Sequence, residues 1–344
     1  MPIKYPMAVV TKPHTVEFQE KTLRKLESEE ILIKTHSAAI CGSDLHLYKG
    51  LHPSVELPSA VGHEASGEVI ETGNAVKKIK DGDRVTIEPV IACGKCDQCK
   101  RGNYNLCENI SFQYRKGQGA FSPYFIAHQD HVFKLPDQIS YEEGVLIEPL
   151  SVAMHAVKKS NIRLGQTSAI FGAGAIGIFV SMLSKQASGV GSYICDIHSF
   201  RLQKALDLGA SLAINSLEQN PVEVILDATA NTGVDRSFEA VGLEVTLKQA
   251  LNVLKLGGIT TMLGIFENPK VQLPINIFVQ KEISLYGSQG YAWDFENSIK
   301  LLANKSINVK PLITHTVSLV DLKKGFDILL DRNIDSLKVI VQMN

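Results

Sequence analysis

Apolar and polar residues follow different patterns in the two halves of the chain. In the first half, short segments rich in β-branched residues are separated by Gly, Pro and Asp, which is typical of strands joined by turns. These segments read ILIKTHSAAI, HEASGEVIETG, DRVTIEP and YFIAHQDHVFKLP. Helical spacing is weak in this half, so the pattern predicts an all-β, barrel-like domain.

The pattern changes near residue 145. Segment 142–160 carries apolar residues at helical spacing, and from Thr167 strands alternate with helices. We expect strands at 168–171 and 192–197 and helices at 175–187 and 200–209. Segments 222–229, 246–258 and 259–265 continue the alternation as strand, helix and strand. This order predicts a parallel, doubly wound sheet with helices on both faces.

The tail has helical spacing at 295–307 and 321–332 and ends with a strand, KVIVQM. Such a tail can return to the first domain. The sequence therefore predicts an α/β protein of two domains. Residues 1–150, completed by 286–344, form the β domain, and residues 151–285 form the doubly wound domain.

Composition narrows the class of protein. With 344 residues the chain is long enough for two domains, and a net charge of −1 gives no general attraction for nucleic acid or anionic membrane. No apolar run reaches the roughly 20 residues that span a bilayer. The N-terminus has no secretory signal pattern, so we expect a cytoplasmic protein.

Residues 171–177 read FGAGAIG, which places Gly172, Gly174 and Gly177 in a G-x-G-x-x-G motif. The motif alone is weak, but here it follows an expected strand and opens an expected helix. Gly172 permits a tight turn, Gly174 lets a pyrophosphate approach the backbone, and Gly177 lets helix and strand pack closely. The pattern predicts a dinucleotide site, with a plain helix–strand turn as the alternative.

Asp196 ends the second strand of this domain, about 20 residues after the motif. An acidic side chain there can accept hydrogen bonds from both ribose hydroxyls and would repel a 2′-phosphate. This favours NAD over NADP. Arg201 leaves the alternative open, because a nearby arginine can accommodate a phosphate or lie over the adenine.

Four of the six cysteines form one cluster, Cys93, Cys96, Cys99 and Cys107. Their short spacings allow a single loop to place four thiolates around one zinc ion. Four sulfur ligands leave no open position, so such a zinc is structural. Disulfides and an iron–sulfur cluster are the alternatives.

A second metal site is suggested by Cys41 in ICGSDLH and by His63 and Glu64 in VGHEASG. A set of Cys, His and carboxylate keeps a position open for water or substrate, as in catalytic zinc sites. Glu148, in IEPLSVAMH, is a further acid at a turn. Its alternative role is a carboxylate favoured at the start of a helix.

Together these motifs resemble the zinc-containing medium-chain dehydrogenase/reductase family, and within it the sorbitol (polyol) dehydrogenase branch. The resemblance rests on ICGSDLH, VGHEASGEV, RGNYNLC, EEGVLIEPLSVAMHA and FGAGAIG, in that order along nearly the whole chain. It implies a GroES-like β-barrel catalytic domain carrying zinc, a Rossmann domain carrying NAD, an active site in the cleft between them, and homodimers or homotetramers.

The resemblance also implies roles for individual residues. Cys41, His63 and Glu64 would anchor the catalytic zinc, and Glu148 would be a ligand or would hold the zinc-bound water. Ser43 would take the proton from the substrate hydroxyl, and His46 would pass it to solvent through the cofactor ribose. The residues that would contact NAD are Ile176, Asp196 and Arg201, with the backbone at Leu263, Gly264 and Ile265 and at Ser288, Gln289 and Gly290 holding the nicotinamide end.

The sequence departs from the polyol branch in its substrate loop. The stretch GSQGY keeps Tyr291 as a substrate residue but has Gly290 where the branch usually has arginine, and Leu47 stands where an aromatic is common. Another polyol or a smaller, less polar secondary alcohol is therefore equally plausible. Four further residues could line a substrate pocket or simply pack in the core: Tyr48, Phe112, Gln113 and Trp293.

Rival functions remain open. A threonine 3-dehydrogenase usually has threonine at the position of Ser43 and aspartate at that of Glu148, and a 2,3-butanediol dehydrogenase fits LIEPLSVAMHA less well. A non-enzymatic zinc–NAD protein would be favoured by loss of Cys41 or His63, and both are present. A zinc-ribbon nucleic-acid binder disagrees with the near-neutral charge.

Overall fold

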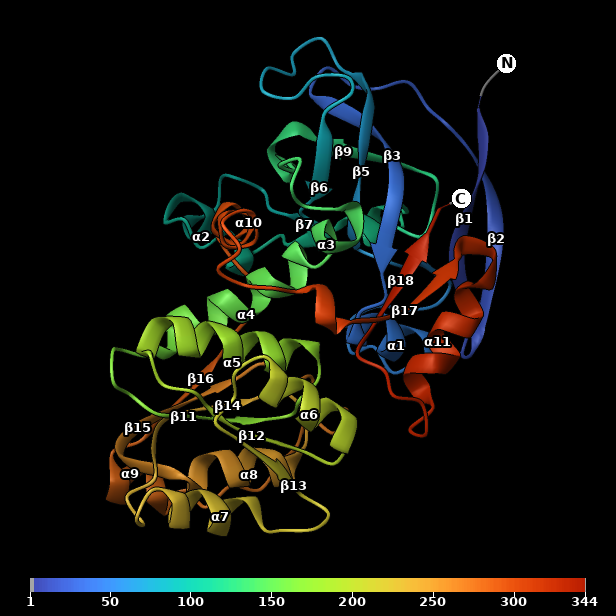
Figure 1. Ribbon diagram of the computed structural model, residues 1–344. Helices are drawn as coiled ribbons and strands as arrows, with labels where there is room; N and C mark the ends of the chain where they lie inside the picture. Colours follow the sequence, from blue (N-terminus) through green and yellow to red (C-terminus); the bar gives the residue numbers. More distant parts are fainter. Residues whose placement is uncertain (1–2, 344) are drawn as a thin grey trace. The chain divides into compact units, whose positions relative to one another are not determined.

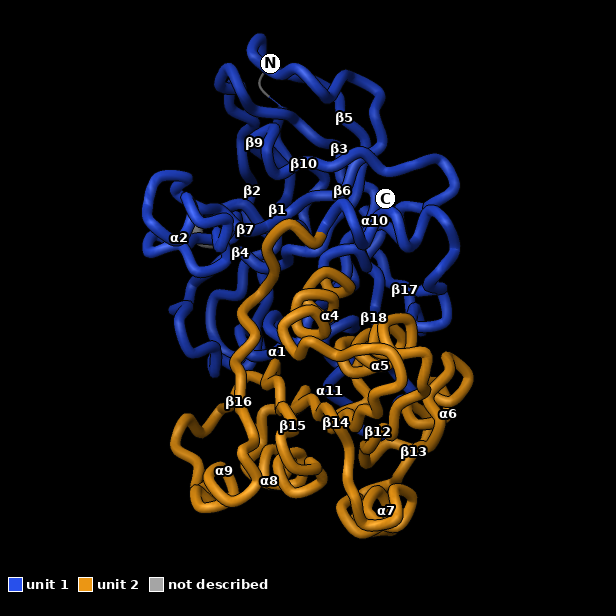
Figure 2. The backbone as a smooth tube through the Cα atoms, turned by 90° about the vertical axis from the view of Figure 1, so that its left-hand side faces the viewer, with its two compact units in different colours: residues 1–148, 295–344 blue, residues 149–294 orange. Residues whose placement is uncertain are grey.

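A computed structural model of the chain describes residues 3–343, with the side chain of Arg115 left out of that description. The chain divides into two compact units (Figure 2). Unit 1 comprises residues 1–148 and 295–344, and unit 2 comprises residues 149–294. The boundaries thus follow Glu148 and Asp294, whereas the sequence pattern places them after residues 150 and 285.

Unit 1 is built on a seven-stranded sheet in which β3 (Glu30–Ala39) is the central strand (Figure 1). The strand order is β10-β6-β5-β3-β18-β17, with β9 also paired to β3. A three-stranded sheet of order β2-β1-β4 completes the unit, together with a β7-β8 pair. These strands are β1 (Lys4–Lys12), β2 (Thr15–Thr22), β4 (Ser59–Ala60), β5 (Glu64–Thr72), β6 (Arg84–Ile87), β7 (Val90–Ile91), β8 (Ser111–Phe112), β9 (Tyr124–His128), β10 (Val132–Lys134), β17 (Ile313–Ser318) and β18 (Lys338–Gln342).

The C-terminal tail belongs to unit 1 because β18 pairs with β3 in antiparallel register, Ile340 opposite Ala39. Ile31, Ile33, Val339 and Val341 are all buried in one apolar core. The helices of this unit are α1 (Gly42–Tyr48), α2 (Asp97–Lys100), α3 (Tyr141–Gly144), α10 (Phe295–Ala303) and α11 (Leu322–Leu330). The last strand, β18, therefore lies in the same unit as the first 148 residues.

Unit 2 is a six-stranded parallel sheet of order β13-β12-β11-β14-β15-β16. Helices cover both of its faces, as Figure 1 shows. The chain order reverses between β11 and β14, which makes this the position where such folds bind ligands. The elements are α4 (Ile147–Ser160), which starts in unit 1, β11 (Ser168–Phe171), α5 (Ala175–Ser188), β12 (Tyr193–Asp196), α6 (Ser199–Asp207), β13 (Leu212–Asn215), α7 (Pro221–Ala228), β14 (Val234–Glu239), α8 (Glu244–Asn252), β15 (Leu254–Met262), α9 (Asn276–Lys281) and β16 (Ser284–Gly287).

Two sequence-based expectations in unit 2 were wrong. Segment 222–229 is not a strand but most of helix α7, which begins after the Asn220 cap with Pro221 in its first turn. Asn220 accepts a hydrogen bond from the Val222 N–H, and proline is well suited to the first helical position. Segment 246–258 is helical only to Asn252, because its last residues, from Leu254, already belong to strand β15.

The expected helix over 142–160 is interrupted between Gly144 and Ile147 and forms α3 and α4. Helix α3 starts with a capping box in which Ser140 and Glu143 bond each other's backbone N–H groups. Among the described residues, no helix is long and apolar enough to cross a membrane.

Candidate active site and metal centres

The ends of neighbouring strands in unit 1 bring Cys41, His63 and Glu64 together. Ala39, at the end of β3, pairs with Glu64 at the start of β5. Because antiparallel neighbours run in opposite directions, the end of β3 lies beside the beginning of β5. The Cys41 sulfur, a His63 ring nitrogen and a Glu64 carboxylate oxygen lie within 4.8 Å of one another. Thiolate, imidazole and carboxylate are the ligands that zinc prefers, so this donor set fits a zinc ion.

Asp44 holds this group in place from the first turn of α1. Its buried carboxylate accepts hydrogen bonds from the N–H groups of Cys41 (2.9 Å) and Gly62 (3.2 Å). Its Oδ1 also lies 3.4 Å from Nδ1 of His63. A carboxylate beside the second ring nitrogen is a common way to orient a metal-binding histidine.

Electrostatics couple the same residues. Burial disfavours a charged imidazolium, but the Asp44 carboxylate and the Cys41 thiol outweigh it and raise the pKa of His63 well above its ordinary value. Burial opposes ionisation of Asp44 as well, yet its pKa is lowered by His63 and by the two backbone N–H donors. Both pKa shifts favour a positively charged His63 beside a negatively charged Asp44.

Glu64 is also paired with a buried lysine at the start of β18. The Lys338 ammonium lies 2.5 Å from both carboxylate oxygens and 3.4 Å from the Ile40 carbonyl oxygen. Burial lowers the pKa of Lys338, but the negative charges of Glu64, Cys41 and Glu148 reverse this and raise it. Lys338 thus neutralises the carboxylate that lies beside the candidate metal ligands Cys41 and His63.

The other residues expected at this site, Glu148, Ser43 and His46, lie on two different helices, α4 and α1. Glu148 is buried in the first turn of α4, but it lies outside the described group of three ligand atoms within 4.8 Å. Ser43 and His46 lie on α1, directly after Cys41, and are partly exposed. Both residues of the expected proton path therefore lie on the helix that begins directly after Cys41.

The four clustered cysteines converge in the loop around α2. The sulfur atoms of Cys93, Cys96, Cys99 and Cys107 lie within 4.8 Å of one another, and all are free thiols rather than disulfides. Backbone N–H groups point at the sulfurs: Cys93 N lies 3.2 Å and Asn109 N lies 3.3 Å from the Cys107 sulfur. This arrangement fits four thiolates around one metal ion, and none of the four cysteines forms a disulfide in the structure.

The cysteines differ in how readily they ionise. Hydrogen bonds from the N–H groups of Lys95 and Cys96 lower the pKa of Cys93 to about 6. Partial burial and the neighbouring thiols raise the pKa of Cys99 to about 12. Four thiolates in contact repel one another, so a bound cation is needed to ionise them all.

The glycine motif forms the turn between β11 and α5 in unit 2. Gly172 has φ +106°, which favours glycine, and a Cβ at Gly177 would overlap the Gly172 carbonyl oxygen. Gly174 caps α5, and a Cβ there would meet nothing within 4 Å, so the backbone is open at this point. The three glycines thus have the distinct uses that a pyrophosphate-binding turn requires.

Asp196 lies at the carboxyl end of β12 and is bound to this turn. Its Oδ2 accepts a hydrogen bond from the Ala173 N–H (2.6 Å), and its Oδ1 accepts from Ile197 (2.7 Å) and His198 (3.0 Å). Ile176 and Arg201 are partly buried in α5 and α6. Asp196 therefore fixes the turn in addition to any contact with a ribose.

The remaining expected site residues fall into two sets. Gly264 and Ile265 follow β15, and Ser288 and Gly290 follow β16, so all four lie at the carboxyl edge of the parallel sheet. The residues named as possible substrate contacts are more varied. Tyr291 is buried, and Trp293 is exposed with φ +64°.

Tyr48 and Phe112 have packing partners of their own. Tyr48 stacks on Phe326 with 4.5 Å between ring centroids and donates a hydrogen bond to the His14 carbonyl oxygen. Phe112 stacks on Tyr114 at 5.4 Å. For Tyr48, therefore, ordinary packing in the core accounts for the side chain.

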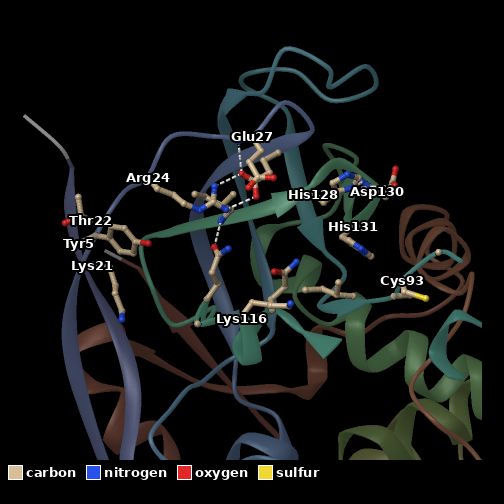
Figure 3. Close-up of a pocket in the computed structure, with 18 residues that line it drawn as sticks. Tyr5, Lys21, Thr22, Arg24, Glu27, Cys93, Lys116, His128, Asp130 and His131 are labelled. Carbon is tan, nitrogen blue, oxygen red and sulfur yellow. Dashed lines mark hydrogen bonds and ion pairs between the residues drawn. The ribbon is translucent and has the colours of Figure 1, made fainter. Parts of the chain in front are cut away.

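A cavity of about 810 Å³ lies beside the cysteine lobe, the loop of residues 93–107 that carries the four clustered cysteines (Figure 3). Gln113 and Cys93 line it, whereas the metal-ligand group of Cys41 does not. Arg24 in its wall is paired with Glu30 at 2.6 Å, and His131 lies 3.2 Å from Glu88. Arg24 and His131 are thus each paired with a protein carboxylate rather than directed into the cavity as a group of metal donors.

Sequence reasoning missed Asp44 and Lys338. Asp44 is part of ICGSDLH, and its position three residues after Cys41 is the spacing of a capping box. Lys338 is the single charge in strand KVIVQ and precedes three consecutive apolar residues, which is an unusual setting for lysine. These two patterns mark Asp44 and Lys338 as unusual, but neither pattern shows that Asp44 lies beside His63 or that Lys338 pairs with Glu64.

Comparison with known families agrees with this architecture. The description "Alcohol dehydrogenase GroES-like domain" matches residues 27–137, and "Zinc-binding dehydrogenase" matches residues 175–304. The sorbitol dehydrogenase of Bacillus subtilis is 35% identical over 342 residues, covering 98% of this chain and 97% of that protein. The chain belongs to the zinc-binding alcohol dehydrogenase family, which confirms the resemblance read from its motifs.

Solved structures show the same fold. The 2R,3R-butanediol dehydrogenase of Bacillus subtilis has a TM-score of 0.90 at 33% identity, covering 99% of this chain and all of that one. A zinc-binding dehydrogenase of Sinorhizobium meliloti 1021 bound to NADP scores 0.93 at 27% identity, with 99% and 100% covered. An alcohol dehydrogenase of Escherichia coli CFT073 in complex with NADH scores 0.91 at 25% identity, with 99% of each chain covered.

Proposed function

We propose that this protein oxidises a secondary alcohol of a polyol-like substrate to a ketone, using NAD and a catalytic zinc ion. The observation that carries the proposal is the convergence of Cys41, His63 and Glu64 within 4.8 Å in a chain that also has the dinucleotide turn. The similar sorbitol and butanediol dehydrogenases act on substrates of this kind by their names. Cys93, Cys96, Cys99 and Cys107 would hold a second, structural zinc.

The residues of unit 1 have separate tasks in this reaction. Cys41, His63 and Glu64 hold the metal, Asp44 orients the His63 ring, and Lys338 neutralises Glu64. Ser43 takes the proton of the substrate hydroxyl, and His46 passes it on toward solvent. When bound, zinc would stabilise negative charge on the alcohol oxygen and NAD would serve as the hydride acceptor.

NAD is the preferred cofactor in this proposal because of Asp196. Its carboxylate ends β12 where the adenosine ribose of a dinucleotide binds in such folds, and it would repel a 2′-phosphate. The similar structures include one with NADH and one with NADP, so the preference depends on this residue of the present chain. Ile176 and Arg201 would contact the same cofactor.

The substrate class follows from the loop that carries Gly290 and Tyr291. Gly290 has φ +51° and offers no side chain, so an arginine-mediated contact to a long polyol is not available at that position. This keeps a shorter polyol and a 2,3-diol such as butanediol within the proposal. L-Threonine is the less favoured substrate because Ser43 and Glu148 differ from the residues usual in threonine dehydrogenases.

A substrate panel tests the proposal. Purified zinc-loaded protein is given NAD and, in turn, polyols, vicinal diols and L-threonine, and NADH absorbance is followed. We expect turnover with a polyol or diol and its loss in Cys41→Ser, with Cys195→Ser as the matched control. Cys195 is buried in β12 of unit 2 and lies outside both groups of metal ligands. No turnover with any alcohol, or full turnover in Cys41→Ser, would refute the proposal.

Assembly and compartment are part of the proposal as well. The family resemblance implies a homodimer or homotetramer, and light scattering of the purified protein would measure its mass. Six free cysteines suit a reducing compartment such as the cytoplasm. A monomeric mass would contradict the proposed oligomer. A location outside the cytoplasm would contradict the proposed compartment.

A further inference from the structure

Glu239 is a buried acid at the carboxyl end of β14, beside the position where the order of the parallel strands reverses. Its Oε1 accepts three hydrogen bonds, from the N–H groups of Val241 (2.9 Å) and Gly242 (2.8 Å) and from the hydroxyl of Thr246 (2.7 Å). One carboxylate oxygen therefore fixes the whole turn between β14 and α8.

The same residue also binds the turn that follows the next strand. The backbone carbonyl oxygen of Glu239 accepts hydrogen bonds from Leu263 (2.8 Å) and Gly264 (3.1 Å). A Cβ at Gly264 would lie 2.5 Å from Oε2 of Glu239, and a Cβ at Gly242 would overlap the Ile265 carbonyl oxygen. The two turns thus touch at a pair of glycines with the Glu239 carboxylate between them.

The turn after β14 contacts the dinucleotide turn on its other side. Gly172 would place a Cβ 2.8 Å from a methyl group of Val241, and Ala240 donates its N–H to the Phe171 carbonyl oxygen at 2.9 Å. Turns after β11, β14 and β15 therefore meet, and Glu239 holds the middle one. All three lie at the edge of the sheet where such folds bind their ligands.

Burying this carboxylate is unfavourable by itself. Within residues 3–343, Glu239 has no salt bridge, and its Oε2 is buried without a hydrogen-bond partner. A buried polar atom without a partner destabilises a fold because it loses its hydrogen bonds to water and gains none in return. Such a residue is expected where a functional site needs a fixed backbone more than it needs the most stable core.

We propose that Glu239 is a positioning residue for the nicotinamide half of the cofactor, acting through the backbone of Val241–Gly242 and Gly264–Ile265. This inference rests on the proposed function, which assigns Gly264 and Ile265 to the nicotinamide end. The side chains of Val241 and Ile265 are 41% and 38% exposed, so the turns that Glu239 fixes present apolar surface at this edge. An apolar face of fixed shape suits a planar ring, whereas the adenosine half depends on the glycine turn and Asp196.

Paired binding measurements test the inference. Dissociation constants for NADH and for ADP-ribose, which lacks the nicotinamide, are measured by titration calorimetry with wild-type protein, Glu239→Ala and Glu239→Gln. In Glu239→Ala we expect NADH to bind about tenfold more weakly, or about 1.4 kcal/mol, with ADP-ribose changed less than about twofold. Glu239→Gln keeps an acceptor for the three donors, so it should lose less NADH affinity than Glu239→Ala.

Two further variants keep the test decisive. Thr246→Val removes one donor but leaves the carboxylate, and it replaces Glu239→Ala if that protein does not fold; we expect the same selective loss, about threefold. Glu244→Gln is the control, because that acid lies nearby but bonds Lys248 and the Gln272 N–H instead. It should bind both ligands as wild type does.

The possible failures are distinguishable. Equal losses of NADH and ADP-ribose affinity in the folded variants, or no loss in any of them, would overturn the role of Glu239 and leave the proposed function intact. Wild-type protein that binds neither NADH nor NADPH would refute the proposed function itself, and with it the inference.

Discussion

Lys338 and Glu64 form an ion pair of 2.5 Å in the core of unit 1, although 274 residues separate them in the chain. Both side chains are almost fully buried. The pair links the last strand of the chain, β18, to the residue that follows His63. The C-terminal segment therefore contributes directly to the electrostatics of the candidate zinc site.

Replacing Lys338 by Met should destabilise the protein strongly. The change leaves the buried Glu64 carboxylate without its lysine partner, and removing one partner of a buried ion pair typically costs about 3–5 kcal/mol. Urea unfolding of the zinc-loaded protein measures the effect. Lys34 on β3 is exposed, so Lys34→Met should change the free energy of unfolding by less than about 0.5 kcal/mol. Equal stability of Lys338→Met and wild type would show that the pair does not hold this site.

The cysteine lobe should depend on its metal. We expect Cys96→Ser to retain one zinc per chain instead of two, measured by atomic emission, and to unfold at lower temperature. A serine hydroxyl does not ionise near neutral pH and cannot complete the four-thiolate set. Cys195→Ser, outside the lobe, should keep both zinc ions. A Cys96→Ser protein with two zinc ions and unchanged stability would rule out a structural zinc there.

Asp196 should decide between the two nicotinamide cofactors. Asp196→Ala removes the charge that repels a 2′-phosphate, so the ratio of kcat/KM for NAD to that for NADP should fall about tenfold or more. The variant also loses the bond to the Ala173 N–H. Asp196→Asn, which keeps a hydrogen-bond acceptor, separates the two effects. If the ratio stays unchanged in both variants, Asp196 does not select the cofactor.

Asp294 should make unit 2 sensitive to acid. Its fully buried carboxylate lies 2.8 Å from the Lys158 ammonium and 3.2 Å from Nδ1 of His155. Burial opposes its ionisation, but these two residues, with the Ala292 N–H, lower the pKa of Asp294 below its ordinary value. A carboxyl with a lower pKa in the folded state stabilises the fold fully above the unfolded-state pKa of about 3.9. That contribution is lost as the pH falls through the folded-state pKa.

We therefore expect Asp294→Asn to lower the free energy of unfolding by about 1–3 kcal/mol at pH 7. The difference from wild type should shrink below about pH 4. The free energy of unfolding is measured with urea at pH 7 and again below about pH 4. Asp130→Asn, at an exposed position, is the control. A difference that is the same at both pH values would contradict the assigned pKa direction.

The fold and much of the site could be predicted from local patterns. The four cysteines and the glycine motif depend on spacing within a few residues, and the structure brings the cysteines together as expected. Segment 222–229 was misassigned because its β-branched residues suit a strand, whereas the Asn220 cap and Pro221 favour a helix start. Local propensity did not show which signal would prevail.

The residues that hold the sites were harder to predict. Lys338 acts on a carboxylate 274 positions away, and Glu239 acts through the turns after two neighbouring strands. These partners are set by strand register, with Ala39 opposite both Glu64 and Ile340. Local patterns in one sequence do not show which residues of two distant strands will lie opposite each other.

Ser43→Ala tests the proton path. The serine follows Cys41 on α1, and its hydroxyl would accept the substrate proton, so we expect turnover to fall about 100-fold or more while the dissociation constant for NADH stays within about twofold. Equal loss of turnover and cofactor affinity would contradict a role in proton transfer.

The most direct measurement follows one hydrogen atom. The alcohol of the substrate panel that gives the most NADH is labelled with deuterium at its secondary carbinol carbon, and the cofactor is analysed by mass spectrometry. The account predicts that one deuterium appears in NADH, that the product is a ketone, and that the transfer is lost in Cys41→Ser. Unlabelled NADH, or transfer that persists without Cys41, would contradict a metal-assisted hydride transfer by this protein.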